Sequence, residues 1–542
     1  MIRPLKNYLL LAIGLTVLFL SCKEKEKKEA PVAVQDTSIT EKTSFNNIFI
    51  DSNLIKQYVA SDKALSRFQE PFLNFYKERN FESAWFDSTG LIEQAGNFIS
   101  LINNYMEQNH DSSLYDKRLY ELYDEYKNAK NISSKHLNPH DINAELYFTG
   151  SFFKYTSKLY GGSNIDATQI GWFIPRKKID LKNLLDSSLK SGGNAQVFDQ
   201  LLNPAYKKLN EYFLKYAALK KEHPDWNNIV VNINKLQLND QNPAIPEIKE
   251  RLSLLEDLSD NDGSDVFDEN MQEAVKSYQN RMGLSADGVI GPGFVRSINT
   301  PLDTLIRKIL VNLERTRWLP STLPETYIWV NIPEYKLHVY ENGEPNFDMR
   351  VIVGSAAHGT VIFTGNLKYI VFAPYWNVPM SIIKNEIIPG IARDPNYIAS
   401  HNMEITGYNK KGEPVDVRQK PGENNALGTV KFLFPNDYDI YLHDTPNHDL
   451  FTSSNRGLSH GCIRLSDPPK MARFLLRNDS TRYTSNKIDS LMHKNKVETW
   501  VTVKNPVPVY LVYFTSWVDD DGKLNFRNDI YGHDKKVADK LF

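Results

Sequence analysis

Cys462 is the residue of this chain best suited to covalent chemistry, and it lies in the run Ser-His-Gly-Cys-Ile-Arg-Leu at 459–465. The chain has 2 cysteines, and the other, Cys22, closes an N-terminal segment that precedes the folded body. Cys462 therefore has no partner for an internal disulfide. His443 lies nineteen residues upstream, and a nearby imidazole can take a thiol proton to leave the reactive thiolate. The pattern predicts a cysteine nucleophile served by a histidine base.

A zinc site is the alternative chemistry for the same residues. Cys462 and the histidines His443, His448 and His460 are all of types that bind zinc. They lack the closely spaced ligand pair of most zinc sites, and His448 follows a Pro-Asn turn. We therefore favour the nucleophile over the metal, and we expect neither a metal nor a cofactor.

The N-terminal segment predicts export and a lipid anchor. Arg3 and Lys6 precede an apolar run at 8–20, which is shorter than the roughly 20 residues that span a bilayer as a helix. The small residue Ser21 then precedes Cys22, an order similar to a bacterial lipoprotein processing site. We expect residues 1–22 to be a lipoprotein signal peptide that leaves lipid on Cys22. A plain signal peptide or a short anchor is the alternative.

The charged and polar stretch at 23–45 contains few apolar residues and is predicted to be a disordered tether. We expect the folded body to be held at a membrane by the N-terminal lipid, facing the periplasm or cell wall. Export places the thiol in an oxidising compartment, where a lone cysteine adds nothing structural. The net charge of −2 gives no basic excess for nucleic acid, so no nucleic-acid partner is expected.

Length and periodicity divide the folded body into helical and β-rich parts. At 542 residues the chain fits about three or four domains. Residues 46–236 have helical spacing, and their aromatic side chains are interpreted as packing core rather than as a carbohydrate platform. Residues 237–300 predict a small unit of three helices, with Asp268 capping the second and Pro292 opening the third. Residues 301–324 predict a connecting helix.

From about residue 325 apolar residues recur at every second position, as they do in strands. This predicts many short strands in a curled sheet or sandwich over 325–535. One of these strands, 438–442, is expected to deliver His443 at its end. Between about 375 and 428 the regular pattern fails, and we interpret this excursion as a lid with one helix at 381–388.

The chemistry-bearing segments resemble the signature of the L,D-transpeptidases. The similarity lies in His-Asp-Thr-Pro at 443–446 and in the run at 459–465, and it extends to segments 312–320, 375–379 and 529–532. Residues 237–300 are similar to the peptidoglycan-binding three-helix module. The resemblance implies a multidomain α+β protein with an N-terminal α-helical scaffold, the small module and a C-terminal mainly-β catalytic domain that carries the lid.

The resemblance also implies roles for the residues around the thiol. Cys462 is the expected nucleophile and His443 the base. Backbone N–H groups of Gly461 and Cys462 are expected to hold the oxyanion of the tetrahedral intermediate, with glycine permitting a turn that a Cβ would block. His460 and Arg464 flank the thiol, and Arg464 either favours the thiolate by its charge or orients loop carbonyls.

Three further residues are expected at the substrate side of the site. Tyr375 and Trp376 are predicted to line the donor groove, with packing inside the lid as an equal alternative. Ser459 is expected near the substrate and to form local hydrogen bonds. Asp444 stands where shorter relatives often have glycine, and it either orients its neighbours or holds the turn.

The segment His-Gly-Thr at 358–360 resembles the upstream histidine motif of shorter relatives more closely than His443 does. It lies 104 residues before Cys462 and follows a strand. We therefore expect His443, and not His358, to serve the thiol.

The implied activity is the formation of 3→3 cross-links between peptidoglycan tetrapeptide stems through a cysteine thioester. The expected partners are stem peptides and glycan, although the small module is equally compatible with a spacer. Two alternatives remain at this point, a cysteine L,D-carboxypeptidase or hydrolase of stem peptides and a non-catalytic cell-wall-binding lipoprotein.

Overall fold

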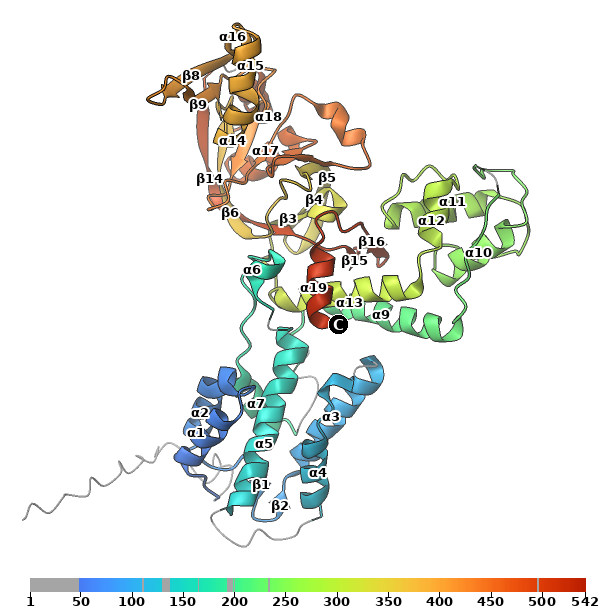
Figure 1. Ribbon diagram of the computed structural model, residues 1–542, viewed down its shortest axis with the longest axis vertical. Helices are drawn as coiled ribbons and strands as arrows, with labels where there is room; N and C mark the ends of the chain where they lie inside the picture. The colour runs from blue at the N-terminus through green and yellow to red at the C-terminus, as the bar shows by residue number, and fades with distance from the viewer. Residues whose placement is uncertain are drawn as a thin grey trace, which may run out of the picture.

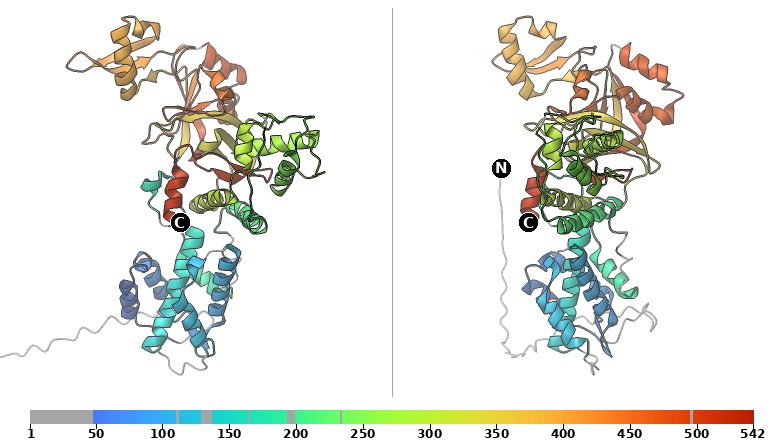
Figure 2. Two further views of the ribbon diagram at one scale, coloured as in Figure 1. Left: turned by 45° about the vertical axis from the view of Figure 1, so that its right-hand side comes forward. Right: turned by 90° about the vertical axis from the view of Figure 1, so that its right-hand side faces the viewer.

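The computed structural model describes residues 48–542 except 110–111, 129–136, 164, 193–197, 199, 233 and 495–496. The predicted signal peptide with Cys22 and the whole of the predicted tether lie outside these residues. The scaffold helices and the lid occupy opposite ends of the long axis, with the small helical module to one side (Figures 1 and 2). The expected fold class is confirmed: a helical region and a helical module precede a mainly-β domain.

The N-terminal region is an aromatic-rich helical bundle. Its core contains Phe72, Phe75, Trp85, Phe148 and Phe152, each at most 1% exposed, so the packing interpretation of these aromatics is confirmed. The main helices are α1 (Ser52–Ser61), α2 (Gln69–Glu78), α3 (Glu93–Asn109), α4 (Lys117–Tyr126), α5 (Pro139–Thr156) and α7 (Leu181–Lys190).

The small module has the three expected helices, α10 (Ile245–Leu254), α11 (Glu269–Arg281) and α12 (Pro292–Ile298). Asp268 caps α11 by accepting a hydrogen bond from the Met271 N–H, as predicted. The module shares one core with α9 (Pro204–Glu222) and with the connecting helix α13 (Leu302–Trp318). Helix α9 thus packs with the module, although it lies inside the range assigned to the scaffold from sequence.

The β-rich domain is a sheet that closes on itself. Its strand order is β12-β5-β13-β11-β10-β6-β14-β3-β4, and β4 also pairs with β5. Closure removes the free edges that an open sheet exposes. The strands are β3 (Tyr327–Asn331), β4 (Lys336–Glu341), β5 (Glu344–Gly354), β6 (Thr364–Phe372), β10 (Val430–Leu433), β11 (Leu442–His443), β12 (Gly457–Ser459), β13 (Ile463–Leu465) and β14 (Thr499–Val512).

The excursion between β6 and β10 folds as a small unit with its own core rather than as an irregular loop. Strands β7 (Trp376–Asn377), β8 (Met403–Tyr408) and β9 (Pro414–Gln419) form an antiparallel sheet. The helical segment begins as α14 (Met380–Ile382), passes through one π-turn and ends as α15 (Ile388–Arg393), so it extends beyond the predicted 381–388. Ile383, Ile387 and Val417 are buried between helix and sheet.

Helix α19 (His533–Leu541) and the hairpin of β15 (Ser516–Val518) and β16 (Leu524–Phe526) connect the β domain to α13. None of the helices among the described residues is long and apolar enough to cross a membrane.

Candidate active site

Two neighbouring parallel strands bring the predicted thiol and imidazole to one face of the sheet. In the pairing of β11 with β13, Leu442 lies opposite Ile463 and His443 opposite Arg464. Leu442 and Ile463 are fully buried in the core. Because side chains alternate along a strand, His443, Arg464 and Cys462 share the other face.

The strand that delivers His443 is shorter than the predicted 438–442. The side chain of Asn436 donates to the carbonyls of Phe434 and Ile440 and accepts from the Ile440 N–H, which closes a turn before β11. Asp439 then adopts a left-handed backbone with φ of 55°. Only residues 442–443 therefore pair as a strand, and His443 still lies at its end.

His443 is held as a neutral base. Its Nδ1 lies 2.6 Å from the Asp444 carbonyl oxygen, and since a carbonyl only accepts, Nδ1 carries the proton and Nε2 keeps a lone pair. Burial, assisted by the charge of Arg464, lowers the pKa of His443 to about 3. The imidazole is therefore uncharged in the resting protein and able to accept a proton at Nε2.

Cys462 is a protonated thiol in the resting site. Burial is the largest influence and raises the pKa of Cys462 to about 11, against opposing contributions from Tyr441 and Arg464. The Sγ atom donates to the Asp439 carbonyl oxygen at 3.5 Å. The backbone and the hydroxyl of Tyr441 lower the pKa of Cys462 and so favour the thiolate.

Tyr441 is the residue at the thiol that sequence reasoning missed. It lies two positions before His443, so the alternation of side chains along a strand places it on the face of His443. That spacing is the signal that would have found it.

The turn that carries Cys462 depends on Gly461 and Ser459. Gly461 has φ of +119°, a conformation that L side chains rarely adopt. A Cβ there would meet only the His358 carbonyl oxygen at 3.8 Å, so backbone conformation, and not crowding, selects glycine. The Ser459 hydroxyl donates to the Cys462 carbonyl oxygen at 2.6 Å and accepts from the Gly461 N–H at 3.1 Å.

These contacts leave the two N–H groups that are expected to bind an oxyanion unequally available. The Gly461 N–H is already engaged with Ser459 Oγ. For the Cys462 N–H we find no acceptor within the part of the chain that the structure describes. The Cys462 N–H is therefore the donor that an incoming oxyanion can use without first breaking a hydrogen bond.

The four residues of the zinc alternative do not converge. His448 Nε2 lies 3.3 Å from Asp444 Oδ1, the exposed His460 ring packs 5.0 Å from that of His358, and His443 is bound to the Asp444 carbonyl. Among the described residues there is no group of three or more His, Cys, Asp or Glu side chains that could hold a metal ion.

Asp444 joins the histidine turn to the base of the lid. Its Oδ2 accepts from both the N–H and the hydroxyl of Thr429 at 2.8 Å, and its Oδ1 accepts from the Thr445 N–H at 2.7 Å. Gly428 packs against this carboxylate with φ of +61°. The same residue thus fixes the lid's C-terminal root and supplies the carbonyl that orients His443.

Tyr375 and Trp376 lie at the other root of the lid. The Tyr375 N–H donates to Glu498 Oε1 at 3.0 Å, and the Arg418 guanidinium lies 4.4 Å from the centre of the Tyr375 ring. Trp376 pairs with Gln419 in the lid sheet and packs against the lid core. The observed contacts of Trp376 correspond to the lid-packing alternative.

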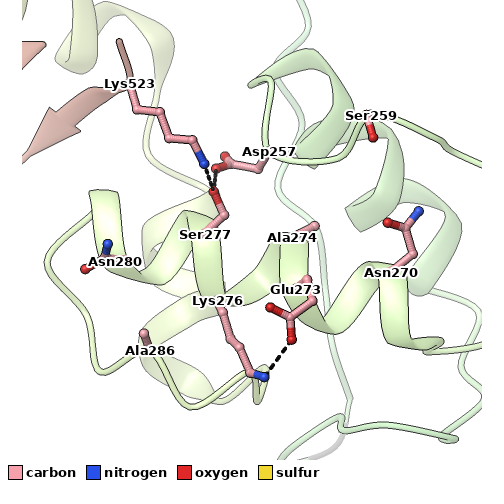
Figure 3. A pocket seen from close by; sticks show the side chains of 10 residues that line it. All are labelled: Asp257, Ser259, Asn270, Glu273, Ala274, Lys276, Ser277, Asn280, Ala286 and Lys523. Carbon is pink, nitrogen blue, oxygen red and sulfur yellow. Dashed lines mark hydrogen bonds and ion pairs between the residues drawn. The ribbon is translucent and has the colours of Figure 1, made fainter. Parts of the chain in front are cut away.

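A surface cavity of about 530 Å³ lies on the small module (Figure 3). Its walls include Lys276 and Ser277 of α11 and Lys523 from the β15–β16 turn. Ser277 donates to Asp257 at 3.0 Å and accepts from Lys523 Nζ at 3.1 Å. Most of its lining residues are polar or charged, and none of them comes from the segments that carry Cys462 or His443.

Three segments of the chain match known families. Residues 325–508 match the YkuD family, described as the L,D-transpeptidase catalytic domain; residues 70–212 match a scaffold domain; residues 241–298 match a putative peptidoglycan binding domain. A "Putative L,D-transpeptidase" from Haemophilus influenzae is 34% identical over 249 residues, which cover 43% of this chain and 49% of that protein. The chain spans about half the length of this curated relative.

Solved structures give weaker similarities. An L,D-transpeptidase from Stackebrandtia nassauensis is 15% identical with a TM-score of 0.22, covering 52% of this chain and 97% of that chain. One from Mycobacterium smegmatis is 16% identical with a TM-score of 0.18, covering 35% and 58%. At these scores the similarities support no assignment of residues.

Proposed function

We propose that the chain, which matches the L,D-transpeptidase catalytic domain, a scaffold domain and a putative peptidoglycan binding domain, forms 3→3 cross-links between peptidoglycan stems through a thioester on Cys462. The observation that supports the proposal is the parallel pairing of β11 with β13, in which His443 lies opposite Arg464, two positions after Cys462. A thiol and a neutral imidazole on one face are the parts that cysteine acyl transfer needs.

Acylation begins with a neutral pair. His443 Nε2 takes the Sγ proton as sulfur attacks the carbonyl carbon between the third stem residue and the terminal D-alanine. The negative charge then moves from sulfur to the carbonyl oxygen, where the Cys462 N–H donates to it. The imidazolium returns its proton to the leaving amine, D-alanine departs, and a thioester remains.

The second half-reaction consumes the thioester. The side-chain amine on the third residue of another stem attacks the thioester carbonyl, and His443 takes a proton from that amine. Collapse of the second tetrahedral intermediate expels the Cys462 thiolate, which recovers its proton from the imidazolium. An amide between two third residues is the product, and enzyme and base return to their starting states.

Arg464 and Tyr441 support the charged stages of this cycle. Both lower the pKa of Cys462 against the effect of burial, so both stabilise the thiolate as it forms. The neighbouring Arg464 charge also holds down the pKa of His443, which returns its proton readily to the leaving group. The lid, rooted through Asp444, would exclude water and favour the amine over hydrolysis.

The proposal includes an extracytoplasmic site of action, since the substrate is the cell wall, with anchoring through lipid on Cys22. The polar cavity on the module is the surface that we assign to glycan (Figure 3). Tyr375 is assigned to the donor side of the substrate groove.

Mass spectrometry of products from disaccharide-tetrapeptide muropeptides tests the function. The full chain should release D-alanine and give a cross-linked dimer, and Cys462→Ser should give neither. His443→Gln should lower the rate by about 10²–10⁴-fold, whereas His140→Gln, an exposed scaffold histidine, serves as the matched control. Dimers from Cys462→Ser would refute the mechanism, and tripeptide monomers alone from the wild type would indicate a carboxypeptidase.

A further inference from the structure

The segment at 358–360, which resembles a catalytic motif but lies far from Cys462 in sequence, contacts the nucleophile turn directly. The Thr360 hydroxyl donates to the Gly461 carbonyl oxygen at 2.7 Å and accepts from the Gly354 N–H at 2.9 Å. Thr360 is 2% exposed, so water does not compete for these bonds. Its hydroxyl therefore ties the end of β5 to the peptide that links Gly461 to Cys462.

This contact determines where the Cys462 N–H points. A trans peptide is planar, and its carbonyl oxygen and its N–H point in opposite directions. The Gly461 oxygen and the Cys462 N–H belong to the same peptide, so fixing the oxygen on Thr360 aims the N–H away from Thr360. Gly461, at φ of +119°, would otherwise allow this peptide to rotate more freely than any other residue would.

Tyr531 holds Thr360 in place from the C-terminal segment. Its hydroxyl donates to the Gly354 carbonyl oxygen at 2.5 Å and accepts from the Thr360 N–H at 3.2 Å. A Cβ on Gly359 would lie 3.4 Å from the Tyr531 ring, so the ring packs closely on the loop. One tyrosine thus fixes both ends of loop 354–360.

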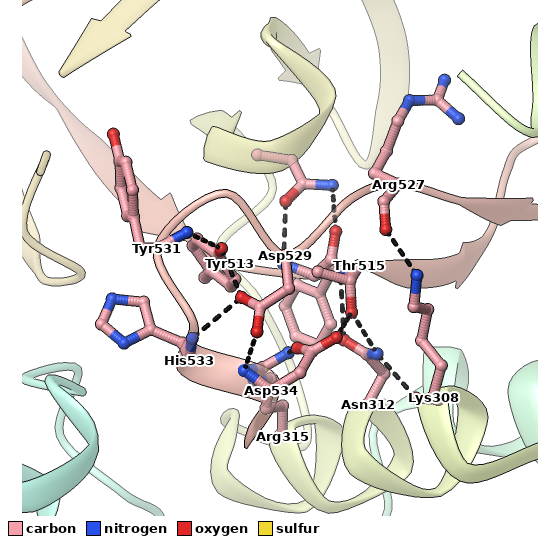
Figure 4. Close-up of polar contacts among 12 residues, drawn as sticks. Lys308, Asn312, Arg315, Tyr513, Thr515, Arg527, Asp529, Tyr531, His533 and Asp534 are labelled. Atoms are coloured by element: carbon pink, nitrogen blue, oxygen red, sulfur yellow. Dashed lines mark hydrogen bonds and ion pairs between the residues drawn. The ribbon is translucent and has the colours of Figure 1, made fainter. Parts of the chain in front are cut away.

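The hydrogen bonds continue from Tyr531 to the next side chains (Figure 4). The Tyr531 N–H donates to the Tyr513 hydroxyl at 2.9 Å, and that hydroxyl donates to Asp529 at 2.7 Å. Asp529 in turn accepts from the backbone N–H groups of His533 and Asp534, at 2.8 and 2.9 Å.

Asp534 completes the path to the connecting helix α13. Its carboxylate pairs with the guanidinium of Arg315 at 2.5 Å and accepts from the Thr515 hydroxyl at 2.6 Å. Arg315 lies on α13 and its side chain is 1% exposed. A single part-buried network therefore runs from α13 to the nucleophile turn.

We propose that Thr360 is a positioning residue for acylation, which orients the Gly461–Cys462 peptide so that the Cys462 N–H meets the oxyanion, and that Tyr531 holds Thr360 for this task. The proposal rests on the proposed acyl transfer at Cys462. In this proposal the loop at 358–360 contributes to catalysis by positioning the Gly461–Cys462 peptide through Thr360, and His358 does not act as a base.

The first test replaces the hydroxyl and keeps the shape of the side chain. Thr360→Val should lower the rate of thioester formation by about 10²–10³-fold, the loss seen when one oxyanion donor is removed. KM should stay within a factor of about three, because the donor acts mainly in the transition state. Thr360→Ser restores the hydroxyl and should recover most of the rate.

The matched control is Thr364→Val. The Thr364 hydroxyl also donates to a backbone carbonyl, that of Val509 at 3.0 Å, but it makes no contact with the nucleophile turn. Its loss should leave thioester formation near the wild-type rate. Equal losses in Thr360→Val and Thr364→Val would overturn the proposal, because they would indicate a general effect of removing a threonine hydroxyl that donates to the backbone. A wild-type rate in Thr360→Val would overturn it as well.

A second readout does not depend on the substrate. In the full chain with Cys22→Ser, Cys462 is the single cysteine, so ¹⁵N-cysteine labelling gives one amide resonance. Thr360→Val should shift it and Thr360→Ser should leave it near the wild-type position. An unshifted resonance in Thr360→Val overturns the positioning role. A wild type that forms no thioester, combined with the expected shift, refutes the proposed function and leaves the positioning of the peptide supported.

Discussion

The reactivity of Cys462 toward iodoacetamide should increase with pH well past neutrality, because burial raises the pKa of this thiol to about 11. The perturbation is pH itself, applied to the full chain with Cys22→Ser so that one thiol reacts. A thiolate stabilised by an imidazolium would behave differently, since it would react at neutral pH. The measurement therefore distinguishes a neutral resting pair from a charged one.

The magnitude follows from the fraction of thiolate. With a pKa of about 11, roughly 3 × 10⁻⁴ of the thiol is ionised at pH 7.5, whereas an ordinary thiol of pKa about 8.5 is roughly one tenth ionised. The folded protein should thus be alkylated about 300-fold more slowly than the same chain unfolded in guanidinium chloride. Steric protection adds to this difference but does not change with pH.

Intact-mass spectrometry gives the second-order rate at each pH, with circular dichroism to verify the fold. From pH 7.5 to 9.5 the rate for the folded chain should rise about tenfold per pH unit, while that for the unfolded chain levels off above roughly pH 8.5. A folded-state rate that levels off below pH 8 would refute the reasoning, because it would show that the thiol ionises readily without substrate.

Three further predictions concern the nucleophile turn, the base and the connecting helix α13. Gly461→Ala places a Cβ at φ of +119° and should cost about 1–3 kcal/mol of backbone strain. We expect a lower thermal midpoint and slower acylation. Unchanged values of both would contradict the role of Gly461 in forming the turn that carries Cys462. His443 has a folded pKa of about 3 and an unfolded pKa near 6.5, so unfolding takes up a proton between these values and stability falls as pH drops from 6.5 to 3. His443→Gln should reduce that pH dependence of the thermal midpoint, and equal slopes in variant and wild type would refute the buried neutral imidazole. Glu314→Gln breaks a buried ion pair with Arg317 at 2.9 Å and should lower the free energy of unfolding by about 3–5 kcal/mol. Glu78→Gln breaks the more exposed pair with Lys182 and should lower it by less than about 1 kcal/mol. Similar losses of stability in the two variants would contradict this difference.

The sequence indicated His443 and Cys462 as the candidate pair because residue type and spacing carry that information locally. The two residues are separated by nineteen positions, and the parallel pairing of two short strands puts His443 opposite Arg464, two positions after Cys462. The three helices of the small module were predicted for the same reason, since Asp268 and Pro292 mark helix starts within a few residues.

Apart from Tyr441, the residues that sequence analysis missed depend on contacts between distant segments. Thr360 reaches Gly461 across 101 positions and Tyr531 reaches Gly354 across 177. No local pattern records such contacts. The contact of Thr360 with Gly461 became visible only from the packing of loop 354–360 on the nucleophile turn.

The shape of the β domain and of the lid also required the structure. Sequence patterns predict strands but not the long-range pairings of β14 with β3 and of β13 with β5 that complete the closed sheet. The lid was expected to be largely irregular because Pro, Gly and charged residues interrupt its periodicity, yet Val417 and Ile383 give it a small core of its own. The lid's short strands alternate too briefly to be recognised from period alone.

Trapping the acyl-enzyme tests the central claim most directly. The full chain is mixed with a tetrapeptide stem that lacks an acceptor amine, quenched in acid and analysed by intact and peptide mass spectrometry. We expect a tripeptide adduct on Cys462 that hydroxylamine removes, with release of one D-alanine per adduct. Release of D-alanine without any adduct on Cys462, or an adduct that persists in Cys462→Ser, would contradict the account.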